Sequence, residues 1–542
     1  MNRNFKRISF FLYSFSLSII FSQPESQFNP FDWVQYRKTG NINSISYSNT
    51  YLYLGSENGG ILRFNLFSER FEEPITIAQG LKSNSIKALH LDSSGSLWVA
   101  TRIGLDFSLS AEGDWRHLTH RELNIPSDLY IEQIGESIDA IWIKTSNIYY
   151  RLDRINGIIL ESMLIPNQKI IWSSNNSNST IDFSSIIINY SLLDGWLYDL
   201  ESLISPNGRK IKITTYLKNS EMNDLWIGTE EGYFFKGDNT MKTLKSFQSG
   251  LAGNHIYDIA GEKSFWLGGR LGANSYGISF FNQFANTSDL YLFDENINMD
   301  RTSIYSILEM KNEVWFGGDG VILSFNKKNN YWKTIQLNIA NPDNQISSLM
   351  NFQDQVWFGS YNGLHVLDFN AKKIKNDILK FFENIIIYDL AIKNHLFFIA
   401  TEIGLHVYDL KNNKLFDYTD FGYKTDDFLP PIRKASFTDL LITKRNLYAA
   451  NQSGIISFNF RTRQWSNAVD ASIFGGLRVK SMAIDKDIIF LSTIDGIIKF
   501  DMRRNFMNIY NYSFIGQVND MYINGRKLWL GTSKGLVSFK FK

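Results

Sequence analysis

The chain lacks cysteine altogether and has only nine prolines and seven histidines among its 542 residues. Without cysteine there is no disulfide, no thiolate metal site and no lipid-bearing cysteine, so stability has to come from packing alone. Neither sign of charge is in excess, because the chain has 55 Lys and Arg residues and 54 Asp and Glu residues. Nucleic-acid-binding domains carry a strong basic excess. We therefore expect no nucleic acid among the partners.

Long apolar runs are also missing, apart from one at the N-terminus. There the basic residues Arg3, Lys6 and Arg7 precede an apolar run over residues 8–21. This order predicts a secretory signal peptide over residues 1–22, with the mature chain beginning near Gln23. The run is shorter than the roughly 20 residues that a membrane-spanning helix needs. We expect an exported protein with no transmembrane segment after cleavage; an uncleaved N-terminal anchor is the alternative.

Aromatic residues, by contrast, make up 15% of the chain and recur in one phrase. The phrase is an aromatic and an apolar residue, a small residue, three variable residues and a glycine, as in Trp98-Val99-Ala100 with Gly104. Its aromatic anchors stand at positions 53, 98, 142, 226, 266, 315, 357, 398, 448, 490 and 529. Successive anchors lie 39 to 50 residues apart, except for one step of 84 residues from 142 to 226.

Each module is expected to contain four strands. In the second module, alternation and turn residues predict strands over 85–91, 97–101, 104–109 and 115–118, with Asp92-Ser93-Ser94-Gly95 as a hairpin turn. No long helical pattern follows the N-terminal run. Four-strand modules repeated at this period predict an all-β chain with a β-propeller fold.

The number of modules is expected to be about twelve. The step of 84 residues equals two periods, so a degraded twelfth module should lie around residues 165–210, with Trp172 and Trp196 as its anchors. Residues 33–36 match the outer-strand phrase, and the chain stops after a third strand at 536–541. The first strand is therefore expected to complete the last blade, which hides free sheet edges.

A twelve-bladed ring would be unusually wide, so two tandem six-bladed propellers are predicted. The polar cluster at residues 282–289 suggests the boundary. The expected domains are the signal peptide (1–22), a first propeller (23–285) and a second propeller (286–542). Seven blades plus five, or one ring of twelve, are the alternatives.

The sequence contains little that is typical of a catalytic site. No phosphate-binding loop, nucleophile elbow or helical metal motif is present, and His117 and His120 lie on a strand with the wrong spacing for a metal pair. His365 and His406 occupy the same register in adjacent modules, which indicates a structural role. We predict no catalytic residue, no metal and no cofactor.

Variation between modules concentrates in the turn between the second and third strands, on the face where loops surround a propeller channel. Loops on a rigid scaffold are where recognition usually occurs. The variable turns also hold Glu57, Asn58 and Gln452. The predicted binding-face residues are Arg102, Glu230, Glu231, Arg270, Asp319, Tyr361, Asn362, Glu402, Asp495 and Lys534.

Two longer phrases, Leu225–Thr229 with Gly232 and Leu528–Thr532 with Gly535, resemble the two-component regulator propeller repeat. The segments at 80–86 and 250–256 resemble its outer-to-inner loop. The resemblance covers most of the chain and fails around residues 145–215. Such repeats occur in extracellular sensor regions of bacterial hybrid two-component systems, where they detect glycans, and in an accessory protein of the type IX secretion system. No kinase or regulator segment follows the repeats here, so the resemblance implies a free-standing exported recognition module.

Two functions are compatible with these patterns. The first is a non-catalytic recognition or scaffold module that binds an envelope protein or glycan, in secretion or surface assembly, and is periplasmic, outer-membrane-associated or secreted. The second is a polysaccharide-active enzyme, a lyase or glycosidase, built on a propeller. No cluster of histidine with carboxylates across modules supports the second. The sequence favours the recognition module.

Overall fold

The computed structural model describes residues 28–176, 187–199, 202–219, 224–238, 240–272, 277–295, 298–337, 344–428 and 435–541. The expected signal peptide lies outside these residues. Strands dominate, and the helices with assigned bounds are single turns: α2 (Ile378–Phe381), η1 (Ile77–Gln79), η2 (Glu230–Gly232), η3 (Tyr418–Asp420) and η4 (Ala471–Phe474). Among the described residues, no helix is long and apolar enough to cross a membrane. The expected all-β class is confirmed.

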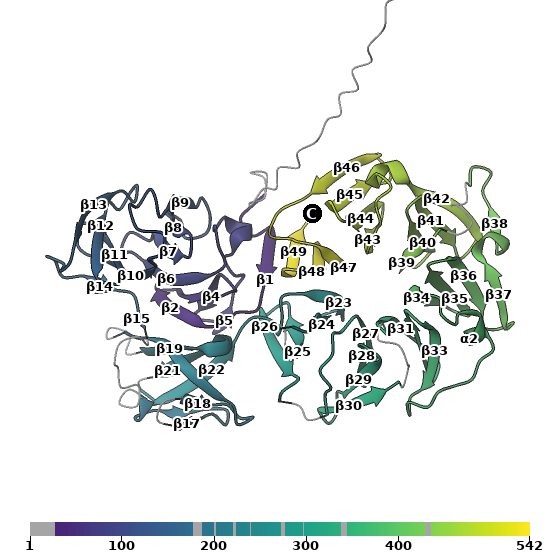
Figure 1. The fold of residues 1–542 in the computed structure, drawn as a ribbon, viewed down its shortest axis with the longest axis horizontal. Helices are drawn as coiled ribbons and strands as arrows, with labels where there is room; N and C mark the ends of the chain where they lie inside the picture. The colour runs from purple at the N-terminus through teal and green to yellow at the C-terminus, as the bar shows by residue number, and fades with distance from the viewer. Residues whose placement is uncertain are drawn as a thin grey trace, which may run out of the picture.

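Seven sheets are arranged around a common centre, each with its first strand innermost (Figure 1). The innermost strands contact one another in a closed order: β23, β27, β31, β34, β39, β43, β47 and again β23. We call this group the seven-sheet ring. Its strands are β23 (Ile256–Ala260), β24 (Ser264–Gly269), β25 (Gly277–Asn282), β26 (Thr287–Leu292), β27 (Ser306–Glu309), β28 (Glu313–Gly317), β29 (Val321–Asn326), β30 (Tyr331–Gln336), β31 (Ile346–Phe352), β32 (Gln355–Ser360), β33 (Gly363–Asp368), β34 (Ile387–Lys393), β35 (Leu396–Thr401), β36 (Gly404–Asp409), β37 (Lys414–Asp417), β38 (Tyr423–Lys424), β39 (Phe437–Ile442), β40 (Asn446–Asn451), β41 (Gly454–Asn459), β42 (Gln464–Asp470), β43 (Met482–Asp485), β44 (Ile488–Thr493), β45 (Gly496–Asp501), β46 (Phe506–Tyr510), β47 (Val518–Asn524), β48 (Lys527–Thr532), β49 (Gly535–Lys540) and β1 (Trp33–Tyr36).

The last sheet of the ring contains strands from both ends of the chain. Strand β1 pairs antiparallel with β49, with Trp33 opposite Phe539 and Tyr36 opposite Leu536. The Trp33 and Phe539 rings stack with their centroids 3.9 Å apart. This pairing is the one that the outer-strand phrase predicts, and it gives β49 a partner instead of a free edge.

Residues between β1 and β23 form a second group of four sheets, to the left in Figure 1. Their innermost strands lie side by side in the order β19, β2, β6 and β10. We call this group the four-sheet unit. Its strands are β2 (Ile42–Tyr47), β3 (Tyr51–Ser56), β4 (Ile61–Asn65), β5 (Arg70–Phe71), β6 (Ile86–Leu91), β7 (Leu97–Thr101), β8 (Gly104–Ser108), β9 (Arg116–Thr119), β10 (Ile131–Glu136), β11 (Ile141–Thr145), β12 (Ile148–Leu152), β13 (Ile159–Met163), β14 (Ile171–Trp172), β15 (Asn175–Asn176), β16 (Ser191–Leu192), β17 (Leu197–Asp199), β18 (Ser202–Ile204), β19 (Lys210–Asn219), β20 (Asp224–Thr229), β21 (Tyr233–Asp238) and β22 (Thr243–Gln248).

The expected division at residue 285 does not coincide with a break between sheets. Asn282 in β25 pairs with Thr287 in β26, so the polar cluster is the turn of one hairpin. The Asn282 side chain accepts hydrogen bonds from the amides of Phe284 and Ala285, at 2.9 and 3.1 Å. Such a turn has the same polar composition as a linker. The sheets of the described residues group as seven and four, in place of the six and six expected, and the four-sheet unit is inserted between β1 and β23.

The expected twelfth module has no four-stranded sheet of its own among the described residues of 165–210. Its short strands join the neighbouring sheets: β14 pairs with β10, β15 with β19, and β16 with β22. Between β14 and β15, the Ser174 hydroxyl accepts a hydrogen bond from the Ile45 amide at 3.1 Å. The step of 84 residues therefore includes a bridging segment at β14 and β15, which lie beside the innermost strands β10 and β19.

The repeated phrase is explained by packing. The eleven anchor aromatics are all buried, with Trp98, Trp142, Trp226 and Trp529 at 0% exposure. In most modules the glycine after the variable turn has a positive φ, 149° at Gly104 and 126° at Gly535. A Cβ at these positions would lie 2.1 Å from the Leu118 carbonyl oxygen and 2.2 Å from that of Tyr36, on the outer strand. Only glycine allows the outer strand to pair so closely.

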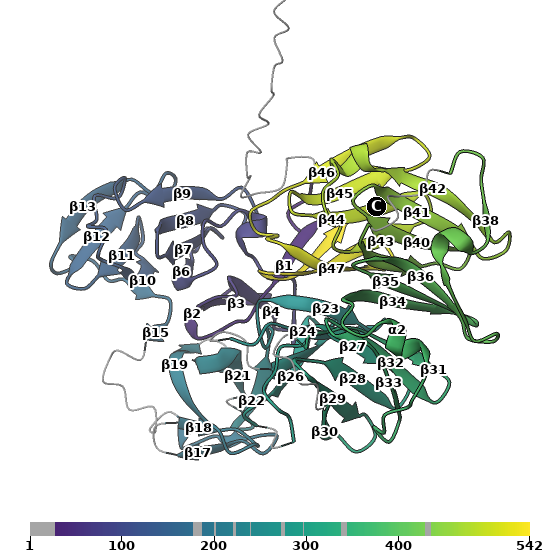
Figure 2. The same ribbon diagram turned by 45° about the vertical axis from the view of Figure 1, so that its right-hand side comes forward.

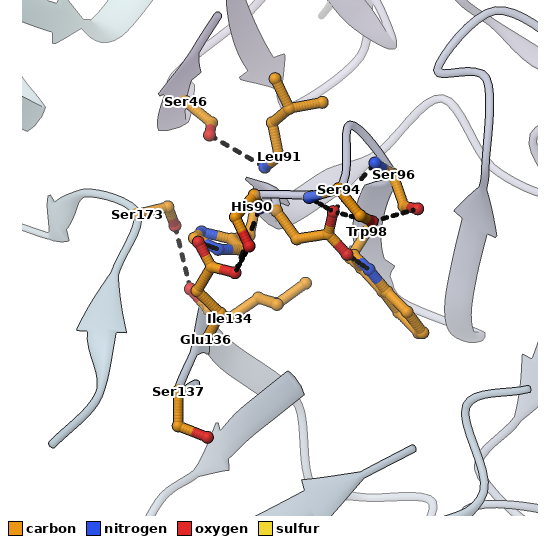
Figure 3. Close-up of polar contacts among 12 residues, drawn as sticks. Ser46, His90, Leu91, Ser94, Ser96, Trp98, Ile134, Glu136, Ser137 and Ser173 are labelled. Atoms are coloured by element: carbon orange, nitrogen blue, oxygen red, sulfur yellow. Dashed lines mark hydrogen bonds and ion pairs between the residues drawn. The ribbon is translucent and has the colours of Figure 1, made fainter. Parts of the chain in front are cut away.

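The second module matches the predicted strands, and a hairpin turn joins β6 to β7. Figure 3 shows Ser94, Ser96 and Trp98 at this turn. The Asp92 carboxylate accepts hydrogen bonds from the amides of Ser94 and Ser96, at 2.9 and 3.0 Å, and from the Trp98 indole at 3.0 Å. The aspartate therefore fixes both the turn and the anchor tryptophan, as the turn reading predicts.

Candidate binding site at the channel mouth

A cavity of about 640 Å³ lies at the centre of the seven-sheet ring. Its wall includes residues from each innermost strand or directly before it, together with Tyr361 from the turn between β32 and β33. Figure 2 shows the same ring turned by 45° about the vertical axis. The volume lies within the range of roughly 300–1,000 Å³ that ligand sites occupy.

A second repeated phrase builds this wall. Each innermost strand carries an apolar residue, a variable residue and then Asp or Ser, as in Ile256-Tyr257-Asp258 and Ile387-Tyr388-Asp389. In β23 the pairing register shifts between Ile256 and Asp258, and β34 shifts at the matching point. The shift is a β-bulge, which re-aims side chains. As a result the variable residue and the Asp or Ser both line the cavity.

The Asp or Ser positions form a polar ring that ties neighbouring sheets together. Asp389 accepts a hydrogen bond from the Leu440 amide on the next strand at 2.9 Å. Asp520 accepts one from the Ile259 amide at 3.0 Å, and Ser348 one from the Leu390 amide at 3.3 Å. We call these residues the polar girdle; they are Asp258, Ser306, Ser348, Asp389, Asp439, Ser481 and Asp520.

Burial raises the pKa values of the girdle carboxyls. Burial, and then the neighbouring Asp520, hold the pKa of Asp258 well above its usual range. Asp439 is shifted in the same direction by burial and then by Asp389 and Asp520. Burial raises the pKa of Asp389 to about 6, against the hydrogen bonds from Ser348, Leu390 and Leu440. The girdle therefore retains protons at pH values where an exposed aspartate is ionised.

Above the girdle, tyrosines and cations surround the mouth of the channel. The rings of Tyr257 and Tyr305 stack with centroids 5.1 Å apart. The Arg478 guanidinium lies 4.7 Å from the centroid of the Tyr388 ring, and the Lys480 ammonium lies 6.0 Å from that of Tyr257. Both cations are exposed and come from the segment before β43. They extend toward rings on non-adjacent strands, β34 and β23, so they lie across the opening.

The ten predicted binding-face residues fall into two groups. Arg102, Glu230 and Glu231 belong to the four-sheet unit. The other seven occupy turns between second and third strands of the seven-sheet ring: Arg270, Asp319, Tyr361, Asn362, Glu402, Asp495 and Lys534. These turns follow the strand that pairs with the start of each innermost strand, so they lie on the face where the mouth opens. Of the ten, Tyr361 lines the described cavity.

Several predicted residues have partners that hold the loops in place. Glu402 accepts a hydrogen bond from the Ile386 amide at 3.0 Å, and the Lys534 ammonium donates to the Ser513 carbonyl at 2.6 Å. The Asn362 amide donates to Asn344 at 3.0 Å. Glu231 pairs with Arg209 in the four-sheet unit. Arg270, Asp319 and Asp495 are exposed.

The five residues that define the mouth were not identified from the sequence. They are Tyr257, Tyr305, Tyr388, Arg478 and Lys480. A signal for the tyrosines existed, because Ile-Tyr followed by Asp or Ser recurs at 256–258, 304–306 and 387–389. The residue types at the positions of Arg478 and Lys480 vary between modules, so these two cations gave no such signal.

The histidines of the described residues do not gather at one site. Burial lowers the pKa of His365 to about 4, and His406 packs against the rings of Phe381 and Phe382. His90 is buried beside Glu136 in the four-sheet unit, with 3.8 Å between Nε2 and Oε1 (Figure 3). Within the described residues, no three His, Cys, Asp or Glu side chains are placed to hold a metal ion.

The fold and the repeated phrases define a β-propeller protein. Residues 80–102, which include β6 and β7, match the family model described as two component regulator propeller. The chain therefore carries a repeat of this family, as the sequence resemblance predicts. A search of curated proteins finds no match.

Three solved structures illustrate the likeness of fold. The extracellular domain of the hybrid two component system BT4673 from B. thetaiotaomicron is 16% identical, with 93% of this chain and 70% of that chain covered and a TM-score of 0.41. PorZ, a surface component of the type-IX secretion system of Porphyromonas gingivalis, is 11% identical, with coverages of 92% and 74% and a TM-score of 0.41. Virginiamycin B lyase from Staphylococcus aureus is 11% identical, with coverages of 53% and 94% and a TM-score of 0.40. Likenesses of this strength say nothing about ligand or reaction.

Proposed function

We propose that this chain is a non-catalytic recognition module, exported to the bacterial envelope, whose partner binds the face of the seven-sheet ring at the channel mouth. The partner is an envelope protein or glycan, engaged in secretion or surface assembly. The observation that carries the proposal is the mouth itself, where Tyr257, Tyr305 and Tyr388 stand beside Arg478 and Lys480 over a cavity. Tyrosine and arginine are enriched among residues that dominate binding.

The girdle carboxyls support a role without chemistry. A general acid or base has to reach the substrate with a free oxygen. Both carboxylate oxygens of Asp389 accept hydrogen bonds from the protein, and one oxygen of Asp520 accepts from the Ile259 amide of the next sheet. Burial raises their pKa values, against the hydrogen bonds by which they join sheets around the channel.

The test compares the two faces of the ring. The partner is first captured from crosslinked cell envelope by the full chain. Arg270→Ala with Tyr361→Ala changes the mouth face, and Lys311→Ala with Asn312→Ala changes the turn between β27 and β28 on the opposite face. All four residues are exposed, so each pair is expected to fold normally.

Capture should fall at least about fivefold for the mouth pair, as for loss of one strong contact, and stay unchanged for the opposite pair. Loss of capture from the opposite pair alone contradicts the proposal. Turnover of a polysaccharide by the purified chain would favour the lyase or glycosidase alternative.

A further inference from the structure

We infer that the partner at the channel mouth is a protein that presents an acidic loop or tail, whose carboxylates bind Arg478 and Lys480. The inference rests on the proposed function and names the chemistry of the partner.

Within the described part of the chain, the two cations have no carboxylate partner. Among the described residues, no ion pair includes Arg478 or Lys480. Arg478 lies over Tyr388, and Lys480 donates to the Asn519 side chain at 2.5 Å. A tyrosine face and an amide orient a cation without cancelling its charge. Both charges therefore remain available to an anion that approaches from solvent.

Other charged groups near the opening leave this field positive. Arg270 and Lys480 both act on His255, whose pKa burial and these cations lower, so this histidine adds no opposing charge. Asp319 is an acid close to Tyr257 and Tyr305. The girdle carboxyls below are engaged with backbone amides, and burial raises their pKa values, to about 6 for Asp389. Beside the mouth tyrosines, the three cations Arg270, Arg478 and Lys480 thus outnumber Asp319. Other turns of the same face carry Glu402, Asp495 and Lys534.

A protein fits this surface better than a simple anion. Protein interfaces have a centre rich in Tyr and Arg and a polar rim. Here Tyr257, Tyr305 and Tyr388 with Arg478 form the centre, and the exposed second-to-third-strand turns form the rim.

The girdle also limits how a peptide can enter. Amides of the innermost strands, such as those of Ile259, Leu390 and Leu440, already donate to girdle side chains. They are not available to pair with an added strand. The acidic segment therefore enters the cavity as a loop or tail and binds through its side chains.

The test uses the full chain with two matched peptides, one of six glutamates and one of six glutamines. The binding variant is Arg478→Gln with Lys480→Gln. The control variant is Lys311→Gln with Lys328→Gln, two exposed lysines in turns on the opposite face. Thermal unfolding checks that both variants fold as the wild type does.

We expect the glutamate peptide to bind at least about tenfold tighter than the glutamine peptide at low salt, because two charge-assisted contacts are lost with the amide. The preference should disappear in the Arg478 and Lys480 variant, persist in the control, and weaken with salt. Equal binding of the two peptides, or no saturable binding at millimolar peptide, overturns the inference. Binding of polygalacturonate but not of the glutamate peptide assigns the site to a glycan and overturns it too.

The outcome separates this inference from the proposed function. If partner capture depends on Arg270 and Tyr361 but not on Arg478 and Lys480, the mouth is the binding face and the acidic partner is wrong. If capture depends on neither pair, both proposals fail.

Discussion

At the scale of single residues, one position in each innermost strand does two tasks. The girdle residue lines the channel and also accepts or donates a hydrogen bond to the next sheet, as Asp389 does with Leu440 and Ser306 does with the Ile346 carbonyl. An unpaired buried amide costs about 1–3 kcal/mol, so satisfying the bulged backbone stabilises every junction of the ring. The side chain is Asp or Ser because both are short acceptors.

Asp389 makes the ring sensitive to pH in an unusual direction. Its pKa is about 6 in the folded chain, against about 3.9 for an unperturbed aspartate. The folded state therefore holds the proton more tightly than the unfolded state. The stabilising contribution is complete below about pH 4 and is lost as the pH rises through 6, by up to about 3 kcal/mol.

Asp389→Asn keeps this position neutral, at a constant cost of about 1 kcal/mol for one altered hydrogen bond. Denaturant unfolding at pH 4.5 and pH 7.5 should show wild type losing stability relative to the variant as the pH rises. The exposed Asp426→Asn serves as control and should follow wild type. Parallel pH dependence in wild type and Asp389→Asn contradicts the assignment.

The anchor tryptophans and the loop aromatics should differ sharply in their effect on stability. Trp357 is 1% exposed between sheets, whereas Tyr361, four residues later, is 37% exposed. Trp357→Ala should lower the free energy of unfolding by about 3 to 5 kcal/mol. Tyr361→Ala should change it by about 0.5 kcal/mol or less. Denaturant titration of both variants measures the two losses in the free energy of unfolding. Similar losses would mean that the buried role of Trp357 and the loop role of Tyr361 are misassigned.

At the scale of elements, the hairpins depend on the glycine that opens the third strand. Gly535→Ala places a Cβ against the Tyr36 carbonyl at φ 126°, where strand β1 joins β49. We expect a loss of roughly 1 to 3 kcal/mol or more. Trypsin cleavage after Arg37 should also become faster, because β1 detaches more often.

Gly272→Ala is the matched control, since no atom of the described residues lies within 4 Å of its added Cβ and its φ is not in the left-handed region. It should change stability by about 0.5 kcal/mol or less. Undiminished stability and protease resistance in Gly535→Ala would show that β1 does not depend on this close approach.

Strands and anchors could be predicted because their signals are local. The phrase at Trp98 and Gly104 predicts a buried aromatic side chain and an outer strand that pairs closely at the glycine. The structure contains both features. The grouping of sheets could not be predicted in this way. The Asn282 turn and a linker share one composition, and the bridging segment at β14 and β15 follows no period. Which innermost strands meet is set by long-range contacts, such as β47 with β23.

The candidate site was only partly predictable for the same reason. The variable turns at Arg270 and Tyr361 indicated the face of the ring on which the cavity opens. The centre of that face depends on Arg478 and Lys480 extending across the opening toward Tyr388 and Tyr257. These contacts join strands that are far apart in sequence, and no local pattern encodes them.

At the scale of the whole molecule, the four-sheet unit is held to the ring through the two segments that connect them. Thr39 donates to the Ser249 carbonyl at 2.7 Å, which ties the outgoing and returning segments together. The Arg37 guanidinium donates to the carbonyls of Asn58 in the four-sheet unit and Lys534 in the ring, at 2.8 and 2.7 Å. This double connection fixes the four-sheet unit near the turn that carries Lys534.

The central claim is that a partner binds the mouth face of the seven-sheet ring. Site-specific photo-crosslinking tests it most directly, with benzoylphenylalanine placed at Tyr361 on the mouth face or at Asn312 on the opposite face of the full chain in its own host. Both sites are exposed, so the label itself should leave the fold unchanged. We predict a discrete crosslinked species from position 361 and none from position 312. Crosslinking from position 312 alone would contradict the account.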